Sequence, residues 1–190
     1  MSIKPILFNT EMVRAILDGR KACTRRILKG AIPFDEKAEY WNVLKKGEWS
    51  GPICVEYFMK QGSPYQPGDI LYVRETWKEA PKGYYYYEDW QRNDIADVTK
   101  WKPSIRMPKE AARIWLRVTD VRVERLQDMT DDDAEAEGCF DYTSTALGFP
   151  DVWDSTIKKS DIDRYGWDAN PWVWVIEFER CEKPKEERGK

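Results

Sequence analysis

The chain has 190 residues, enough for one domain with its own hydrophobic core and no stabilising disulfides. It has no histidine, and none of its four cysteines belongs to a Cys-x-x-Cys pair, so a Cys/His zinc site and a histidine-based catalytic triad are excluded and we expect no metal or cofactor. The net charge of −3 excludes a generally basic nucleic-acid coat, but ten tryptophans, ten tyrosines and six phenylalanines favour a surface that stacks on flat ligands.

The start of the sequence, Met1–Pro5, contains no long apolar run of the kind found in a signal peptide. No segment approaches the ~18 consecutive apolar residues of a membrane-spanning helix. The cysteines lie far apart in the sequence, so we expect free thiols in a reducing compartment: Cys23, Cys54, Cys139 and Cys181. We therefore expect a cytoplasmic protein with no membrane partner, whose oligomeric state does not follow from the sequence.

Charge is distributed unevenly along the chain. Residues 1–30 hold seven Lys and Arg against two Asp and Glu, whereas residues 128–141 hold seven acidic residues and no Lys or Arg. This asymmetry favours one local basic site over a generally basic surface.

The first predicted elements are a strand and a helix. Ile3–Phe8 is apolar enough for a strand, and Pro5 places it at a sheet edge because proline cannot donate a ladder hydrogen bond. A helix over residues 10–18 follows, with Thr10 as its N-cap and an apolar face at i, i+3, i+4 spacing. Gly19 can adopt positive φ and end this helix.

A basic octet, Gly-Arg-Lys-Ala-Cys-Thr-Arg-Arg at residues 19–26, comes directly after the helix and is predicted to be a loop. Lys21 and Thr24 are three residues apart and converge in a turn, where a lysine of lowered pKa can deprotonate a hydroxyl. An activated thiol at Cys23 is an alternative nucleophile. By itself, the octet is also typical of a surface loop that holds a phosphate or only water.

Residues 30–67 are rich in glycine, proline and charge, and we predict a long loop with one hairpin and a short strand at Ile53–Phe58. After a turn at residues 67–69, a strand at Ile70–Trp77 places Glu75 on an otherwise apolar face. Because a buried unpaired carboxylate is costly, Glu75 must pair with a cation, be protonated or line a cavity. A salt bridge to an arginine is the simplest of these.

Two more strands are predicted in the middle of the chain. Tyr84–Trp90 presents two aromatic faces, and a polar loop at residues 91–104 and a short helix at Lys109–Ala112 follow it. The strongest strand pattern is Arg113–Leu126, in which the apolar alternation slips near Thr119. The slip predicts a bulge that lets a sheet curl, with a tight hairpin as the alternative.

A short acidic helix, Thr130–Glu137, is predicted next, with Thr130 as its N-cap and Gly138 at its end. Asp131–Asp133 suit the positive end of the helix dipole, but Glu137 lies in the last turn, where negative charge is unfavourable. Glu137 would gain from a cation that another part of the fold supplies. An exposed last-turn glutamate is the simpler alternative.

The C-terminal part contains a helical segment at Asp151–Lys159 and a strand at Trp172–Glu179 whose residues alternate between two faces, followed by a charged tail at residues 183–190. Strands outnumber helices and pair non-locally. We therefore predict an α+β protein, a small curled β-barrel with peripheral short helices and long loop insertions, in a single domain of residues 1–182.

The octet is similar to a family motif, Gly-x-Lys-x-x-(Glu/Thr)-x-Arg after a helix. The defined positions are filled by Gly19, Lys21, Thr24 and Arg26. Tyr-Val-Arg-Glu-Thr-Trp at residues 72–77 and the Trp-rich segment at residues 167–178 match in order. The chain thereby resembles the ASCH family of the PUA-like superfold, in a long form like that of bacteriophage and prophage members. This resemblance implies a compact β-barrel core, with insertions at about 30–65 and 80–105.

Within that family, the octet is similar to that of small bacterial N(4)-acetylcytidine amidohydrolases, in which a lysine, a threonine and a glutamate in an Ala-Glu-x-Glu context are catalytic. The match implies catalytic roles for Lys21, Thr24 and Glu137, and hydrolysis of an N-acylated pyrimidine nucleoside in a basic cleft. Trp77 is expected to stack on the base. The expected substrate-binding residues are Arg20, Arg26, Glu75, Trp77 and Arg106.

In the implied mechanism, Lys21 deprotonates Thr24, whose oxygen attacks the amide carbonyl, and Glu137 orients Lys21 or protonates the leaving amine. Because a neighbouring carboxylate raises a lysine pKa, the reverse assignment, in which Glu137 activates Thr24 or a water, stays open. The alternative function is a non-catalytic module that binds RNA or modified nucleic acid through the octet cations. A phage accessory protein that acts through a host partner is a third possibility.

Overall fold

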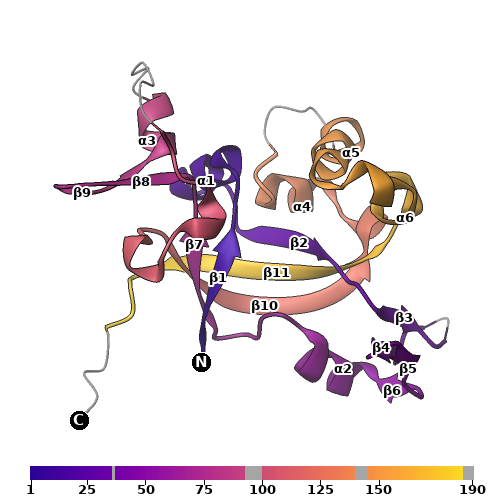
Figure 1. The fold of residues 1–190 in the computed structure, drawn as a ribbon. Helices are drawn as coiled ribbons and strands as arrows, with labels where there is room; N and C mark the ends of the chain where they lie inside the picture. Colours follow the sequence, from indigo (N-terminus) through magenta and orange to yellow (C-terminus); the bar gives the residue numbers. More distant parts are fainter. Residues whose placement is uncertain (36, 93–99, 140–144, 186–190) are drawn as a thin grey trace, which may run out of the picture. The chain divides into compact units, whose positions relative to one another are not determined.

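The computed structural model describes residues 1–35, 37–92, 100–139 and 145–185 (Figure 1). The chain divides into two compact units, one formed by Met1–Ala22, Pro67–Thr119 and Phe178–Lys190, the other by Cys23–Gln66 and Asp120–Glu177. Each unit combines strands with short helices, which confirms the predicted α+β class. Closure of the sheet into a barrel and the single domain stay predictions. No helix in the described part of the chain is both long enough and apolar enough to cross a membrane.

The largest sheet has the strand order β1-β7-β10-β11-β2. Its two longest strands, β10 (Trp115–Arg125) and β11 (Trp172–Cys181), each continue from one unit into the other. The alternative of a hairpin near Thr119 is wrong, because β10 is a single strand through that point. Alternation of buried and exposed residues stops there, since Thr119 and Asp120 are both exposed.

In the first unit, β1 (Ile3–Leu7) pairs in parallel with β7 (Ile70–Arg74), and β7 pairs antiparallel with the first part of β10. As Pro5 predicted, β1 lies at the end of the strand order. A buried cluster that includes Trp77, Met107 and Trp115 forms a core of this unit. Its other elements are short: α1 (Thr10–Leu17), β8 (Trp77–Ala80), β9 (Gly83–Tyr86), α3 (Tyr87–Arg92), η1 (Ser104–Arg106) and η2 (Lys109–Ala111).

The start of α1 differs by one residue from the prediction. Asn9, not Thr10, is the N-cap, and its side-chain oxygen accepts a hydrogen bond of 2.8 Å from the backbone N–H of Met12. An asparagine amide oxygen caps a helix as well as a hydroxyl does, so the two candidates cannot be separated by residue type. Gly19 has φ of +75° and ends the helix as predicted.

In the second unit, β2 (Cys23–Ile27) pairs antiparallel with the first part of β11. A separate small sheet has β4 (Tyr40–Lys45) between β3 (Ala31–Pro33) and β5 (Glu48–Trp49), and β4 also pairs with β6 (Ile53–Cys54). The helices of this unit are α2 (Val55–Gly62), η3 (Leu126–Asp128), α4 (Asp131–Ala136), α5 (Thr145–Thr156), η4 (Lys159–Asp161), α6 (Ile162–Tyr165) and η5 (Trp167–Ala169).

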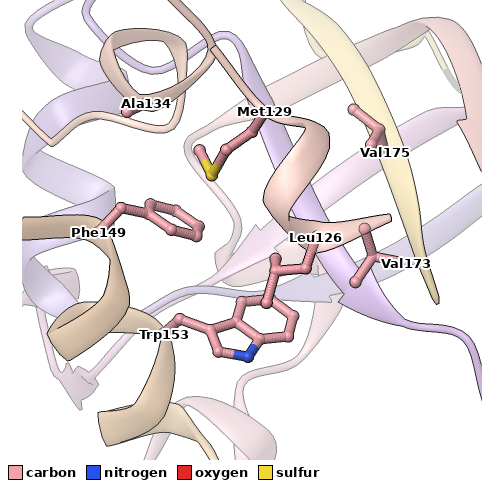
Figure 2. Packing of buried hydrophobic residues seen from close by; sticks show 7 residues of the cluster. All are labelled: Leu126, Met129, Ala134, Phe149, Trp153, Val173 and Val175. Atoms are coloured by element: carbon pink, nitrogen blue, oxygen red, sulfur yellow. The ribbon is translucent and has the colours of Figure 1, made fainter. Parts of the chain in front are cut away.

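The two faces of β11 belong to two different packing groups within the second unit, as its alternating sequence predicted. On one face, Val173 and Val175 pack with residues of η3, α4 and α5 (Figure 2). On the other face, Trp174 stacks on Phe58 of α2 with ring centroids 5.3 Å apart, and Phe58 stacks in turn on Trp41 of β4 at 5.1 Å. The small sheet is therefore anchored to β11 through aromatic rings.

The prediction of a long loop at residues 30–67 is wrong, because these residues form the small sheet and α2. The segment Ile53–Phe58 has the period of a strand, but only its first two residues are extended and the rest begins α2. Packing of Phe58 against Trp41 accounts for the difference, since tertiary contacts override a weak local preference.

The predicted strand at Tyr84–Trp90 is also only half correct. β9 ends at Tyr86, and α3 follows. Glu88 of α3 is almost fully buried and accepts a hydrogen bond of 2.9 Å from Arg14 of α1, which ties the two helices of the first unit together. The helix predicted at Asp151–Lys159 begins earlier, at Thr145 of α5.

Candidate functional site

The octet is a loop only in its first half. From Cys23 onward its residues form β2, so the prediction of a loop over residues 19–26 is wrong there. Because successive side chains of a strand point to opposite faces, Thr24 and Arg26 share one face of β2 and Arg25 lies on the other. Thr24 is fully packed, with 2% of its surface exposed.

Glu137 reaches the octet from the end of α4. Thr130 caps the start of this helix, as predicted, in a capping box with Asp133. The helix ends at Glu137, its C-cap residue, followed by Gly138 with φ of +92°. Glu137 is 6% exposed, and its Oε1 accepts a hydrogen bond of 2.6 Å from the backbone N–H of Arg25.

This hydrogen bond follows from the position of β2 at the end of the sheet, where one row of backbone groups has no strand partner. The N–H of Leu28 donates to the carbonyl of Trp172, and antiparallel bonding alternates along the strand, so the N–H of Arg25 points away from β11. Glu137 satisfies this edge donor. It thereby joins α4 to a strand that lies 112 residues earlier in the sequence.

The guanidinium of Arg25 has no exposed surface and is surrounded by three carboxylates. Its Nη2 lies 2.6 Å from Glu124 and 3.2 Å from Asp133, and its Nη1 lies 3.6 Å from Glu137. Burial by itself lowers the pKa of Arg25, but the charges of Glu137 and Glu124 outweigh burial and raise it. Arg25 is therefore a structural cation that gathers acidic side chains around β2.

Arg122 extends this network, and sequence reasoning missed it. It forms ion pairs with Glu124 at 3.2 Å and with Asp133 at 3.6 Å, and also pairs with Glu177. A signal was available, because Arg122 and Glu124 are two residues apart in a strand and share a face with opposite charges.

Arg26 lies on the other face of β2, opposite Trp174 in the strand pairing. Arg26 as a residue is partly exposed, but its guanidinium is surrounded by protein. This burial lowers the pKa of Arg26, although the negative charge of Glu137 acts to raise it. Burial likewise raises the pKa of Tyr65, against the charge of Arg26. Arg26, Glu137 and Tyr65 thus interact electrostatically within the second unit.

Lys21 belongs to the first unit, and Thr24 and Glu137 belong to the second. Lys21 is 5% exposed, and its ammonium lies 5.4 Å from the ring centre of Phe8. Its backbone N–H donates to the carbonyl of Ala15 in α1, at 3.1 Å. The helix therefore holds the lysine in place, while the convergence of Lys21 with Thr24 and Glu137 stays a prediction.

Glu75 has the arginine partner that its position required. Its two carboxylate oxygens accept hydrogen bonds of 2.9 Å from Nε and Nη2 of Arg113, and Nη1 of Arg113 contacts Asp89 at 2.7 Å. Burial raises the pKa of Glu75, although Arg113 acts in the opposite direction. This bidentate pair has a structural role, and we do not include Glu75 in the proposed substrate site.

The other predicted substrate-binding residues also lie in the first unit. Trp77 is 3% exposed; Tyr84 packs edge-on against its ring, and the ammonium of Lys102 lies 4.6 Å from the ring centre. We therefore withdraw the stacking role of Trp77. Arg106 is exposed at the end of η1, and Arg20 pairs with Asp18 at 3.2 Å.

The cysteines are free thiols, as predicted. Cys23 is buried, and its sulfur lies 3.8 Å from Nη1 of Arg25 and 3.9 Å from the carbonyl oxygen of Asp133. Within the described ranges, no group of three or more Cys, Asp and Glu side chains is arranged to hold a metal ion.

No protein-family model matches the chain, and no curated protein matches it. Among solved structures, it is similar to an ASCH domain from Lactobacillus crispatus JV V101, with 13% identity over 94% of this chain and 79% of that chain and a TM-score of 0.47. It is also similar to the hypothetical protein PH0355, with 15% identity over 95% of this chain and all of that chain and a TM-score of 0.45. We base the proposed function on the residues of this chain.

Proposed function

We propose that the protein hydrolyses the amide bond of an N-acylated pyrimidine nucleoside such as N(4)-acetylcytidine, with Lys21, Thr24 and Glu137 as its catalytic residues. The observation that supports this most is the hydrogen bond from Arg25 to Glu137. It joins a buried carboxylate to the backbone N–H of the residue that follows Thr24.

The charge around β2 favours an uncharged substrate over the phosphates of RNA. The guanidinium of Arg25 is already matched by Glu124, Asp133 and Glu137, and in the first unit Arg20 is paired with Asp18. A phosphate would have to compete with these carboxylates. Affinity for a nucleic-acid backbone comes from protein cations that neutralise its phosphates and release the counterions condensed on them. Because these arginines are paired with carboxylates, a non-catalytic RNA-binding module is the weaker candidate.

In the proposed reaction, Thr24 Oγ1 attacks the acyl carbonyl and forms an ester while the C–N bond breaks and the nucleoside amine takes up a proton. Water then cleaves the ester, releasing the carboxylic acid and restoring the hydroxyl. Either Lys21 or Glu137 accepts the threonine proton. If Glu137 is the base, its bond to the Arg25 amide orients the carboxylate; if Lys21 is the base, Glu137 protonates the leaving amine.

The test is turnover of N(4)-acetylcytidine by the pure protein, with cytidine separated by chromatography. Thr24→Val removes the hydroxyl at nearly constant volume, and Thr24→Ser keeps it, so the two variants form a matched pair at a buried position. We expect no turnover from the valine variant and partial turnover from the serine variant. Turnover that survives in Thr24→Val contradicts the nucleophile, and an inactive wild-type protein contradicts the proposed function.

A further inference from the structure

The small sheet of the second unit has one face that packs against the rest of the unit and one face that is exposed. Its inner face carries Trp41, which is 1% exposed and packs on Phe58 and Trp172. Tyr40, Asn42 and Leu44 alternate with Trp41 along β4 and therefore lie on the opposite, outer face. Residues paired with them share that face: Ile32 lies across from Asn42, Trp49 lies across from Leu44, and Phe34 donates its N–H to the carbonyl of Tyr40. The apolar members of this outer face are Ile32, Phe34, Tyr40, Leu44 and Trp49.

All five residues of the outer face are exposed, by 42% for Leu44 up to 60% for Phe34. They are contiguous, because directly opposed residues of antiparallel strands have Cβ atoms about 5 Å apart and diagonal neighbours are within reach of aromatic rings. Exposed apolar residues that occur singly need no explanation, but a contiguous patch marks an interaction surface. Figure 1 shows the short strands β3, β4, β5 and β6 that form this small sheet.

We propose that this outer face is the contact surface of a homodimer, in which the face of one copy packs against the same face of a second copy. Five side chains of this size, about half exposed, offer on the order of 500 Å² per copy. Two copies together then bury about 1,000 Å², the area at which specific contacts separate from incidental ones. The proposal is independent of the proposed hydrolytic function.

The described strand residues on the outer face are uncharged, which fits an apolar partner such as a second copy better than a polyanion. Glu39 and Lys45 alternate with Tyr40 and Leu44 along the chain, so they lie on the side of Trp41 and not on the outer face. In a two-fold contact the outer face meets itself, and no like charges of the described strand residues are brought together. A nucleic acid would require an excess of cations, yet residues 29–60 hold equal numbers of cations and acids: Lys29, Lys37, Lys45, Lys46 and Lys60 against Asp35, Glu36, Glu39, Glu48 and Glu56.

Sedimentation equilibrium of the full chain, from about 1 to about 200 µM, tests the proposal. We expect a reversible dimer in the wild-type protein. Trp49→Ser and Leu44→Glu should each weaken association at least ~10-fold with unchanged circular dichroism, because both residues are exposed on the outer face. Ile105→Ser is the matched control, since Ile105 is 65% exposed but belongs to the first unit, and it should leave association unchanged.

A protein that stays monomeric over the whole range overturns the proposal, as does a dimer that Trp49→Ser and Leu44→Glu leave unchanged. Quenching of tryptophan fluorescence by a single-stranded oligonucleotide in a monomeric wild-type protein, lost in Trp49→Ser, would assign the face to nucleic acid instead.

Discussion

Glu75 stands out in the sequence because it lies on an apolar strand face, and Glu137 because it lies in the last turn of a helix. Both are buried in the structure, but their hydrogen-bond donors differ. Glu75 of the first unit accepts two hydrogen bonds of 2.9 Å from one guanidinium, that of Arg113. Glu137 of the second unit accepts a bond of 2.6 Å from a backbone N–H, and its nearest contact with the Arg25 guanidinium is longer, at 3.6 Å. Arg25 makes its shorter contacts with Glu124 instead.

The difference separates an acid that stabilises the fold from one that can act on a substrate. A bidentate arginine pair fixes the orientation of both carboxylate oxygens. A carboxylate that accepts a backbone N–H, as Glu137 does from Arg25, is held in a fixed position, which a general acid or base requires. The comparison supports our proposal that Glu75 stabilises the fold and that Glu137 takes part in the chemistry.

The largest expected effect separates the two acids by activity. Glu137→Gln keeps an oxygen that can accept from the Arg25 amide but removes the charge, and we expect kcat on N(4)-acetylcytidine to fall by ~10²–10⁴-fold. Glu75→Gln is the matched substitution in the first unit and should leave kcat within about threefold in protein that remains folded. Steady-state kinetics at saturating substrate provide the measurement.

An equal loss of kcat in both glutamine variants would break the distinction between the two acids. A loss confined to Glu75→Gln would reverse it. Circular dichroism of both proteins controls for unfolding, because each side chain is buried.

The second prediction concerns stability in the first unit. Arg113→Met removes the partner of Glu75 and leaves a buried carboxylate without its cation, so the free energy of unfolding should fall by about 3–5 kcal/mol. Urea denaturation measures the change. The double variant Arg113→Met with Glu75→Met should recover most of the loss, because a well-packed apolar pair can replace a buried ion pair; no recovery would mean that Asp89 or the aromatic ring of Tyr86 is the more important partner of Arg113.

How far the sequence predicts this molecule can be judged from the same residues. The N-cap role of Thr130, the positive φ of Gly19 and the alternation of β11 follow from local chemistry, and each prediction is confirmed. The salt bridge of Glu75 also follows, since burial of a charge demands a partner, but the identity of Arg113 does not, because 38 residues separate the two in the chain.

The predictions that are wrong share a physical cause. Residues 31–62 form a sheet and a helix because Trp41 and Phe58 can stack onto the tryptophans of a strand more than 100 residues later, a contact that no local period encodes. Residues 23–26 of the octet form part of a strand because β11 pairs with them. In both places, non-local contact outweighs a turn-rich or highly charged local sequence.

The third prediction distinguishes two acids by the pH dependence of stability. Burial raises the pKa of Glu75 above its ordinary value of 4.5, so between 4.5 and the raised value the folded protein holds a proton that the unfolded chain has lost. Stability should therefore decrease as pH rises through that range. Partial burial would raise the pKa of Asp133, but hydrogen bonds from Thr130 and the charge of Arg25 lower it below 3.8, so its contribution is lost as pH falls through the lowered value.

Urea denaturation from about pH 3 to about pH 7 measures both slopes. Glu75→Gln should remove the decrease above pH 4.5, and Asp133→Asn should flatten the loss at the acid end. A wild-type profile that Glu75→Gln leaves unchanged in shape would show that Glu75 stays ionised throughout, as a fully compensated ion pair would.

The smallest expected effect compares the helix starts of the two units. Thr130→Ala removes the side chain that caps α4, and Asn9→Ala removes the cap of α1, so each should lower the free energy of unfolding by about 1 kcal/mol. Their effects on activity should differ in kind. Because α4 ends at Glu137, fraying of that short helix loosens the bond to Arg25, and we expect Thr130→Ala to lower kcat severalfold with KM nearly unchanged. Asn9→Ala loosens the helix that precedes Lys21. If Asn9→Ala lowers kcat as much as Thr130→Ala does, Lys21 is favoured as the base. If only Thr130→Ala lowers kcat, Glu137 is favoured as the base.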